Sequence, residues 1–422
     1  MNGYLDMELL RFTTAGSVDD GKSTLIGRLL YDSKSIFEDQ LEAVKTASER
    51  HGDAGVNLAL LTDGLRAERE QGITIDVAYR YFATPKRKFI IADTPGHIEY
   101  TRNMVTGAST ADAAVMLVDA RNGILEQTRR HAYIAALLRL DHVVVAINKM
   151  DLVDFSEEVY RRIRHDYGDI AAKLGLKHVH YIPISARDGD NVVNRSARMP
   201  WYTGDTLLHL LETLPLKTGL GQRSMRLPVQ YVIRPQSADF PDYRAYAGRL
   251  ASGSVRVGDR VTVLPSGTHS TVSAIDEADR SLVEATAPQS VAVSLADDVD
   301  VSRGCMIVKE GEEPRSGNDL QLTVCWLNHR PLSIGTRYIV RHATDEAVGI
   351  VKQVDYKVNI NTLERDSADK RVGMNDIARI RLKTSRPLSY DDYAENKVTG
   401  SLILIDAATD ETVGAGMIVS DN

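Results

Sequence analysis

Eight residues near the amino terminus have the types and spacing of a phosphate-binding loop. The sequence GSVDDGKS at 16–23 matches the pattern G-x-x-x-x-G-K-[ST] and stands between an apolar run and an amphipathic run. Glycines allow the backbone angles by which the loop N–H groups converge on phosphate oxygens at a helix start. The Lys22 ammonium would reach the β- and γ-phosphates, and the Ser23 hydroxyl would coordinate Mg²⁺. The candidate phosphate-binding residues are Gly16, Ser17, Val18, Asp19, Asp20, Gly21, Lys22, Ser23 and Thr24.

A second polar group, DTPGH at 93–97, directly follows the apolar run 89–92. Asp93, at a strand's carboxyl end, is placed to hold a Mg²⁺-bound water. The Gly96 N–H would face a γ-phosphate, and the His97 imidazole could orient or polarise the attacking water. In isolation, Asp-x-x-Gly is a common turn and His97 an ordinary surface histidine. The candidate residues here are Asp93, Thr94, Pro95, Gly96 and His97.

Thr74, in GITI at 72–75, follows a charged stretch at 66–71 that on its own is typical of a solvated face. A threonine in a mobile loop can close over a γ-phosphate, with its hydroxyl on Mg²⁺ and its N–H on the phosphate, and let go after hydrolysis. Ser23, Thr74 and Asp93 are therefore the predicted metal-binding residues. The predicted catalytic residues are Lys22, Thr74 and His97.

The sequence NKMD at 148–151, after the apolar run 143–147, has residues that distinguish guanine from adenine. Asp151 would accept hydrogen bonds from guanine N1–H and the 2-amino group, and adenine would leave this buried carboxylate unsatisfied. Lys149 would lie along the base, and Asn148 would join this loop to the phosphate loop. Alone, such a motif could be a helix N-cap. The candidate base-binding residues are Asn148, Lys149, Met150, Asp151, Ser185 and Ala186, the last two through backbone donors to guanine O6.

Residues 1–216 alternate short apolar runs with amphipathic stretches, which predicts an α/β domain with a doubly wound, mostly parallel sheet. The expected strands are 9–15, 89–93, 113–118, 143–148 and 179–184, with helices at 22–30 and 127–138. The parallel strands' carboxyl ends would bring the motifs to one edge of this sheet.

Beyond a predicted linker at 214–228, short Val- and Ile-rich runs separated by Gly, Asp and Pro predict an all-β half. A polar break at 309–319 divides it into two barrels, residues 226–312 and 316–422. The expected strands are 229–233, 246–250, 260–264, 291–295, 320–327, 377–382 and 401–405. The chain has two cysteines, which is too few for a disulfide framework or a four-cysteine metal site. Both Cys305 and Cys325 are expected to be small buried side chains.

The order of these motifs resembles the GTP-binding domain of translation-factor GTPases, a match that covers about the first 210 residues. The stretch GRLASGSVRVGD at 248–259 is similar to a hairpin in the barrel that follows that domain, although its glycines also suit ordinary turns. The resemblance implies that His97 orients the attacking water. It also implies GTP and Mg²⁺ as ligands and two barrels after the GTPase domain, as in elongation factors.

Four stretches resemble, more narrowly, the GTPase subunits of bacterial sulfate adenylyltransferases: residues 16–31, 229–235, 402–406 and 413–418. Where elongation factors usually have His in the phosphate loop, this chain has Asp20. The resemblance implies that GTP hydrolysis drives formation of adenosine 5'-phosphosulfate and pyrophosphate from ATP and sulfate by a separate catalytic small subunit, in a heterodimer or an assembly of heterodimers. No second phosphate loop occurs, so an adenylylsulfate kinase activity is not expected.

Composition separates the rival functions. With 51 Lys and Arg against 58 Asp and Glu, the formal charge of −7 argues against a nucleic-acid partner and against an elongation factor that carries aminoacyl-tRNA, the main alternative. A nucleotide-bound scaffold without turnover is a third possibility. The sequence has no apolar stretch long enough to predict a membrane helix. Residues 1–12 do not have the pattern of a signal peptide. A cytoplasmic protein is expected.

Overall fold

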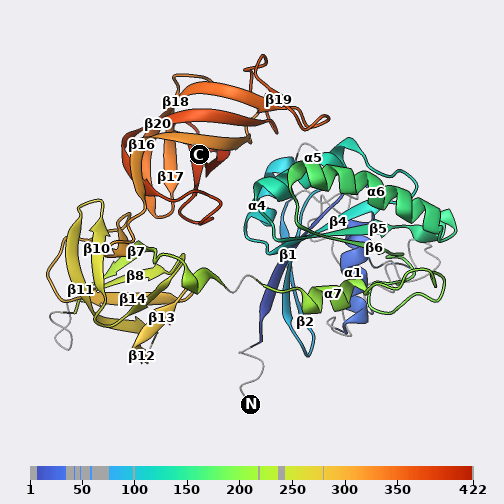
Figure 1. The fold of residues 1–422 in the computed structure, drawn as a ribbon, viewed down its shortest axis with the longest axis horizontal. Coiled ribbons are helices and arrows are strands. Elements are labelled where there is room, and N and C mark those ends of the chain that lie inside the picture. The colour runs from blue at the N-terminus through green and yellow to red at the C-terminus, as the bar shows by residue number, and fades with distance from the viewer. Residues whose placement is uncertain are drawn as a thin grey trace. The chain divides into compact units, whose positions relative to one another are not determined.

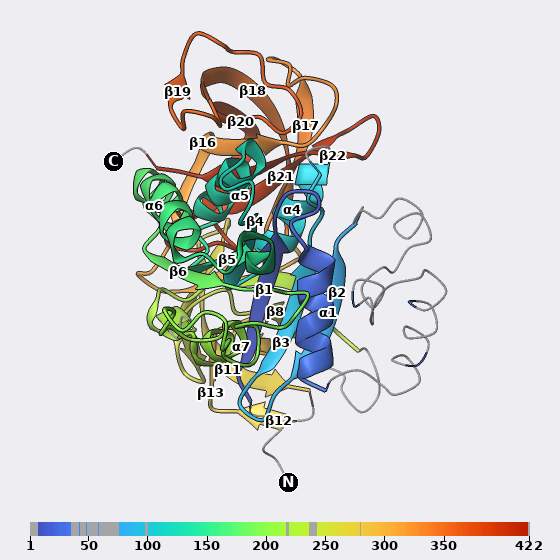
Figure 2. The same ribbon diagram turned by 90° about the vertical axis from the view of Figure 1, so that its right-hand side faces the viewer.

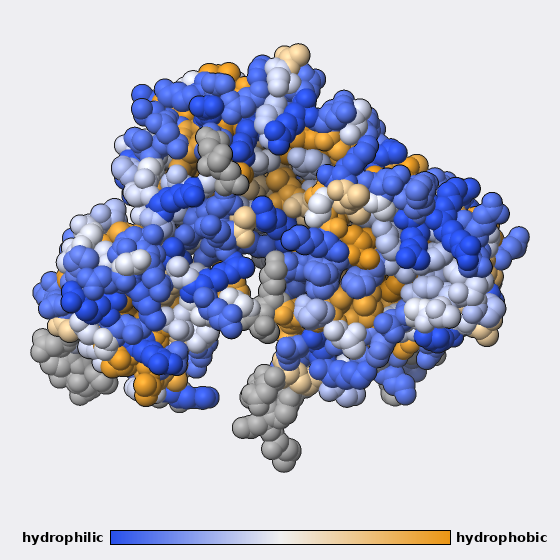
Figure 3. Space-filling view, in the orientation of Figure 1, coloured by the Kyte–Doolittle hydropathy of each residue, from blue (hydrophilic) through white to orange (hydrophobic). Residues whose placement is uncertain are grey.

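The computed structural model describes residues 7–34, 42, 48, 58, 76–97, 100–216, 219–235, 243–278 and 280–420. The chain divides into two compact units, one of residues 1–216 with 359–364 and one of residues 217–358 with 365–422. Thr74 lies outside the described residues, so its role stays a prediction. On the face that Figure 3 shows, hydrophilic residues predominate over each unit.

The amino-terminal unit contains a six-stranded sheet in the order β2-β3-β1-β4-β5-β6. Strand β2 is antiparallel to β3, and the other neighbours are parallel, which confirms the predicted mostly parallel sheet. Its strands are β1 (Leu9–Ala15), β2 (Ala78–Ala83), β3 (Lys88–Asp93), β4 (Ala113–Asp119), β5 (His142–Asn148) and β6 (His178–Pro183). The helices of this unit include α1 (Lys22–Asp32), α4 (Thr101–Ser109), α5 (Glu126–Leu137), η3 (Met150–Val153), α6 (Glu157–Leu174) and α7 (Leu207–Thr213).

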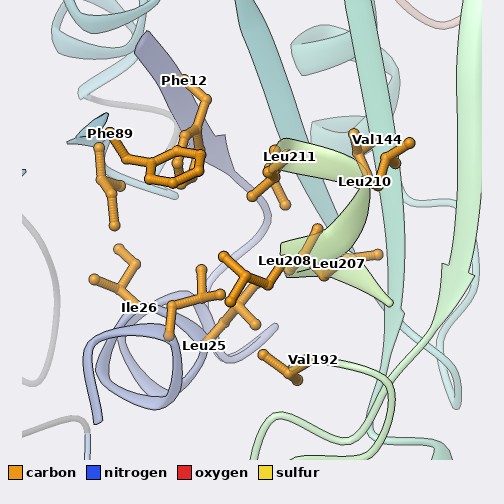
Figure 4. Packing of buried hydrophobic residues seen from close by; sticks show 14 of the residues in the cluster. Phe12, Leu25, Ile26, Phe89, Val144, Val192, Leu207, Leu208, Leu210 and Leu211 are labelled. Carbon is orange, nitrogen blue, oxygen red and sulfur yellow. The ribbon is translucent and has the colours of Figure 1, made fainter. Parts of the chain in front are cut away.

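Helices cover both faces of this sheet. Helices α1 and α7 lie on one face, and α4, α5 and α6 on the other (Figures 1 and 2). Strands β4 and β5 are buried along their whole length, as expected for parallel strands covered on both sides. Apolar residues of α1 and α7 pack beneath the sheet against Phe12, Phe89 and Val144 (Figure 4). This core fixes α1, and with it the phosphate loop, against the sheet.

The second unit contains two closed β sheets. In the first, a β10–β11 pairing closes the ring β10-β15-β7-β8-β14-β11, and in the second a β17–β18 pairing closes the ring β17-β21-β22-β16-β20-β18. The first half contains η4 (Gly219–Gln222), β7 (Leu227–Ile233), β8 (Ala245–Arg249), β9 (Ser254–Arg256), β10 (Arg260–Leu264), β11 (Thr268–Glu277), β12 (Arg280–Leu282), β13 (Glu284–Thr286), β14 (Ser290–Leu295) and β15 (Met306–Lys309). The second contains β16 (Arg315–Trp326), β17 (Arg337–His342), β18 (Asp345–Val358), β19 (Arg365–Asp366), β20 (Ile377–Tyr390), β21 (Ser401–Asp406) and β22 (Thr412–Ile418).

Three expectations about this half need correction. The polar break predicted at 309–319 is shorter, because residues 315–319 begin β16 and pair with β20 across a bulge. The linker predicted at 214–228 is also shorter, because Arg226 and Leu227 are buried and β7 begins at Leu227. Cys325 is buried as expected, whereas Cys305 is only half-buried and precedes β15. The exact domain boundaries stay a prediction.

Among the residues that the structure describes, no helix combines the length and the apolar character needed to cross a membrane.

Candidate functional site

The candidate site lies at the carboxyl edge of the parallel sheet, where five strands end. Thr14 of β1 is in register with Asp93 of β3, and Asp119 of β4 is in register with Asn148 of β5. Since parallel strands end at the same edge, the loops after β1, β3, β5 and β6 all emerge there. The register therefore assembles the predicted motifs, apart from Thr74, at one edge of the sheet.

The phosphate loop has the backbone shape of an anion site. Asp19 and Gly21 have positive φ angles of 66° and 91°, and such angles let successive N–H groups turn inward. Helix α1 starts directly after Gly21, and no side chain caps its first turn. The first N–H groups of the helix are therefore open to an external anion. A Cβ on Gly21 would lie 2.5 Å from the Asn148 amide nitrogen, so this position requires glycine.

Lys22 is buried and points back into the loop. Its ammonium donates to the carbonyl oxygens of Gly16 at 3.2 Å and Ser17 at 3.3 Å. Burial lowers the pKa of Lys22, and the nearby carboxylates of Asp93 and Asp20 oppose this shift. Both of the hydrogen bonds that this ammonium makes to the described residues go to neutral carbonyl oxygens, so neither occupies it with a carboxylate in place of an incoming phosphate. Lys22 is therefore suited to bind phosphate.

The loop after β3 lies against the phosphate loop. The Thr14 hydroxyl donates to the Asp93 carboxylate at 3.2 Å, and the Thr94 hydroxyl donates to the Thr14 carbonyl at 2.5 Å. A Cβ on Gly96 would lie 2.6 Å from the Gly16 carbonyl and would also meet the Lys22 ammonium, so only glycine fits there. His97 is half-buried, with its ring centroid 6.0 Å from that of Tyr100.

Asn148 joins three loops through its side chain. Its amide nitrogen donates to the Asp20 carbonyl at 2.7 Å, and its amide oxygen accepts from the Ala186 N–H at 2.9 Å. The contact with the phosphate loop is the one predicted from the sequence. Ser185 and Ala186 are buried beside it, and Met150, which precedes Asp151 in η3, is also buried. The elements that would bind base and phosphates thus share one buried amide.

Sequence reasoning missed Asp119, the last residue of β4. Its carboxylate accepts from the Arg121 guanidinium at 2.7 and 3.0 Å and from the Lys149 ammonium at 3.0 Å. Burial alone would raise its pKa, but hydrogen bonds from Arg121 and Lys149 lower the pKa of Asp119 to about 2. Lys149 also donates to the Asp19 carbonyl, so Asp119 holds it between two loops. The signal was present, because Asp119 ends an apolar strand just as Asp93 does.

Two family models match the chain. Residues 7–218 match the elongation factor Tu GTP binding domain, and residues 319–419 match the GTP-eEF1A C-terminal domain-like family. The solved structure of Sup35 with GDP aligns with 99% of this chain and 95% of its own, at 23% identity and a TM-score of 0.45. The first of the two family matches identifies residues 7–218 as a GTP-binding domain.

Curated relatives are similar over nearly the whole chain. Sulfate adenylyltransferase subunit 1 of Sulfurovum sp. (strain NBC37-1) is 52% identical, and the match covers 99% of this chain and 89% of the relative. Sulfate adenylyltransferase subunit 1 of Cellvibrio japonicus is also 52% identical, over 99% of this chain and 89% of its own length. The bifunctional enzyme CysN/CysC of Mycobacterium tuberculosis is 52% identical over 98% of this chain and 67% of its own length. The chain belongs to the family of sulfate adenylyltransferase subunit 1, in the translation-factor class of GTPases.

Proposed function

We propose that the chain binds GTP with Mg²⁺ and hydrolyses it, and that this hydrolysis drives formation of adenosine 5'-phosphosulfate and pyrophosphate from ATP and sulfate on a separate catalytic small subunit. The observation that carries the proposal is the Asn148 amide. It links the loop suited to phosphates with the loops suited to guanine, in a chain 52% identical to subunit 1 relatives. The protein would work in the cytoplasm.

Each motif has a role in this proposal. The N–H groups of residues 16–24 and the Lys22 ammonium bind the phosphates, and the Asp151 carboxylate binds the guanine N1–H and 2-amino group. Ser185 and Ala186 supply backbone donors to guanine O6. His97, on the loop whose Gly96 lies against Lys22, orients the water that attacks the γ-phosphorus. The products are GDP and inorganic phosphate.

The donor set fits a magnesium ion. The Ser23 hydroxyl and the Asp93 carboxylate offer only oxygen, which Mg²⁺ prefers, and Thr74 would add a second hydroxyl. In the described part of the chain, no group of three or more His, Cys, Asp or Glu side chains is arranged to hold a metal ion. This suits an ion that enters with phosphates and keeps water ligands. When bound, it neutralises charge on the β- and γ-phosphates.

The coupling to the partner requires that the two nucleotide states differ in affinity for it. The loops that would sense the γ-phosphate are those of Thr74 and of 93–97. Gly107 of α4 packs closely on Thr94, since a Cβ there would lie 2.5 Å from the Thr94 methyl group. A movement of the 93–97 loop would therefore be transmitted to α4 through this contact.

The proposal is tested by changing the base that this chain recognises, since ATP also takes part in the reaction. The Asp151→Asn variant should accept xanthosine instead of guanosine nucleotides, because an amide can donate where the xanthine 2-oxygen accepts. With the small subunit, ATP and sulfate, we expect XTP to drive adenosine 5'-phosphosulfate formation by the variant, and GTP to drive it for the unchanged chain.

An exposed acid on α6, outside the predicted nucleotide-binding residues, provides the matched control. Asp166→Asn, on α6, removes the same charge and should keep GTP dependence. Equal product with and without GTP would refute the coupling. Unchanged GTP preference in Asp151→Asn would refute the assignment of the base-binding residue. Purification of the unchanged chain with bound tRNA would favour the elongation-factor alternative.

A further inference from the structure

The phosphate loop contains a buried carboxylate of its own. Asp20 is 3% exposed, and its Oδ2 accepts the Ser17 N–H at 2.6 Å across the loop. A Cβ on Gly16 would lie 3.2 Å from this oxygen, so the carboxylate fits closely between the start and the end of the loop. The Asp20 side chain therefore determines how the loop folds on itself.

The charges around Asp20 leave it incompletely neutralised. Burial raises the pKa of Asp20, and the Ser17 N–H and the Lys22 ammonium act in the opposite direction. Both nearby ammonium groups make their hydrogen bonds elsewhere. Lys22 donates to the carbonyls of Gly16 and Ser17, and Lys149 donates to the Asp119 carboxylate and the Asp19 carbonyl. The carboxylate of Asp119 adds further negative charge at this edge of the sheet.

A negative charge at this place acts against the ligand of the loop. The N–H groups and Lys22 create a positive potential for phosphates, and a buried carboxylate lowers that potential through a medium that screens poorly. The same carboxylate holds the Ser17 N–H, which keeps the loop closed around the phosphate site. The charge of Asp20 weakens phosphate binding, whereas its hydrogen bond supports it. A neutral residue of the same shape would remove the charge and keep the hydrogen bond.

We propose that Asp20 is an affinity-setting residue, whose hydrogen bond shapes the phosphate loop and whose charge weakens the binding of guanine nucleotides and speeds the release of GDP. The inference rests on the proposed function, because it assumes that the loop binds GTP and GDP. It predicts that this chain holds GDP less tightly than a neutral residue at position 20 would allow.

The test compares Asp20→Asn with the unchanged full-length chain. The Asn side-chain oxygen can still accept the Ser17 N–H, so the variant removes the charge and keeps the loop contact. We expect about tenfold tighter GDP binding and slower GDP dissociation, the scale of one poorly screened charge acting on a polyphosphate. Guanosine carries no phosphate, and its affinity should stay the same. Asp166→Asn, an equal loss of charge at an exposed place on α6, should leave both affinities unchanged.

Asp20→Ser provides a second neutral side chain in case the Asn amide nitrogen disturbs the fold, which thermal unfolding would reveal. Tighter GDP binding by either folded variant, with unchanged guanosine binding, supports the inference. Equal or weaker GDP binding by both would overturn it while GTP binding by the unchanged chain stands. An equal gain for guanosine and GDP would also overturn it, because the charge would then not act through the phosphates. If the unchanged chain binds no GDP, the proposed function fails as well.

Discussion

At the scale of single residues, the site depends on polar side chains that bridge loops. The Asn148 amide contacts the phosphate loop and the loop after β6, and the Asp119 carboxylate holds Lys149 against the phosphate loop. The Asn148 bridge is buried, so removing this amide would leave the groups it contacts without a hydrogen bond, whereas Lys149 is only half-buried. The geometry of the site consequently depends also on Asp119, which was not among the predicted nucleotide-binding residues.

The proposed role of His97 in hydrolysis can be tested separately from nucleotide binding. We expect His97→Ala to keep its affinity for GTP, because the phosphates are bound by the loop N–H groups and Lys22. Its hydrolysis rate should fall by at least ~100-fold, the usual contribution of a positioned proton-handling group. Single-turnover hydrolysis and nucleotide affinity, measured on the same preparation, check both parts. Undiminished hydrolysis would leave His97 a structural residue.

The sequence indicates the glycines of the loops more readily than the side-chain contacts around them, because motif spacing encodes local backbone requirements. Gly21 and Gly96 were found by pattern, and the structure shows that a Cβ at either place would meet Asn148 or Lys22. Arg121 has no such pattern, since its contact with Asp119 depends on how the loop after β4 turns. Thr74 falls outside the described residues, and its role is still a prediction.

At the scale of elements, strands with one uniform environment were predictable and strands that change environment were not. Strand β1 was expected at 9–15 and is found at Leu9–Ala15, and β5 differs from its expected start by one residue. Strand β20 was expected at 377–382 but continues to Tyr390. The extension was missed because four of the eight residues 383–390 are exposed, so it has no continuous apolar pattern. Strand β18 was not predicted at all, and its pairing with β20 contains two register shifts. Bulges interrupt the alternation on which sequence prediction depends.

Helix α5 gives the amino-terminal unit a dependence on pH. His131 is 1% exposed and contacts the Gln127 amide at 2.9 Å. Burial, with smaller contributions from Lys22 and Arg130, lowers the pKa of His131 to about 3. The folded protein therefore binds the proton less readily than the unfolded chain does. The stability that neutral His131 provides is complete above its unfolded pKa, near 6.5, and is lost as the pH falls towards 3.

We expect His131→Leu to flatten this dependence. Between pH 7 and pH 5 the unchanged chain should lose about 2 kcal/mol of unfolding free energy through this residue, and the variant should lose that much less. Denaturant unfolding of both proteins at the two pH values gives the comparison. The slope with pH is the result that matters, because the substitution also changes packing. Parallel slopes would show that His131 is not the group responsible.

At the scale of the whole molecule, the second unit is joined across its two sheets by a buried ion pair. Arg226, just before β7, donates to both carboxylate oxygens of Asp391, each at 2.9 Å, and also to the Glu312 carbonyl at 2.6 Å. The side chains are 6% and 10% exposed. The Asn396 amide donates to the Ser252 hydroxyl at 2.9 Å between the same two halves. The sequence predicted Arg226 as the first residue of a barrel. It could not identify the partner, Asp391, which lies 165 residues later in the chain.

Breaking this pair on one side should therefore destabilise the second unit. Arg226→Met leaves the Asp391 carboxylate buried without its cation, and we expect a loss of about 3–5 kcal/mol in unfolding free energy. The double variant Arg226→Met with Asp391→Leu removes both charges and should recover a large part of that loss, measured by denaturant unfolding. Arg256→Met breaks an exposed pair with Glu284 and should shift the transition little. A double variant as unstable as the single one would mean that packing around Arg226, and not its charge, joins the two sheets.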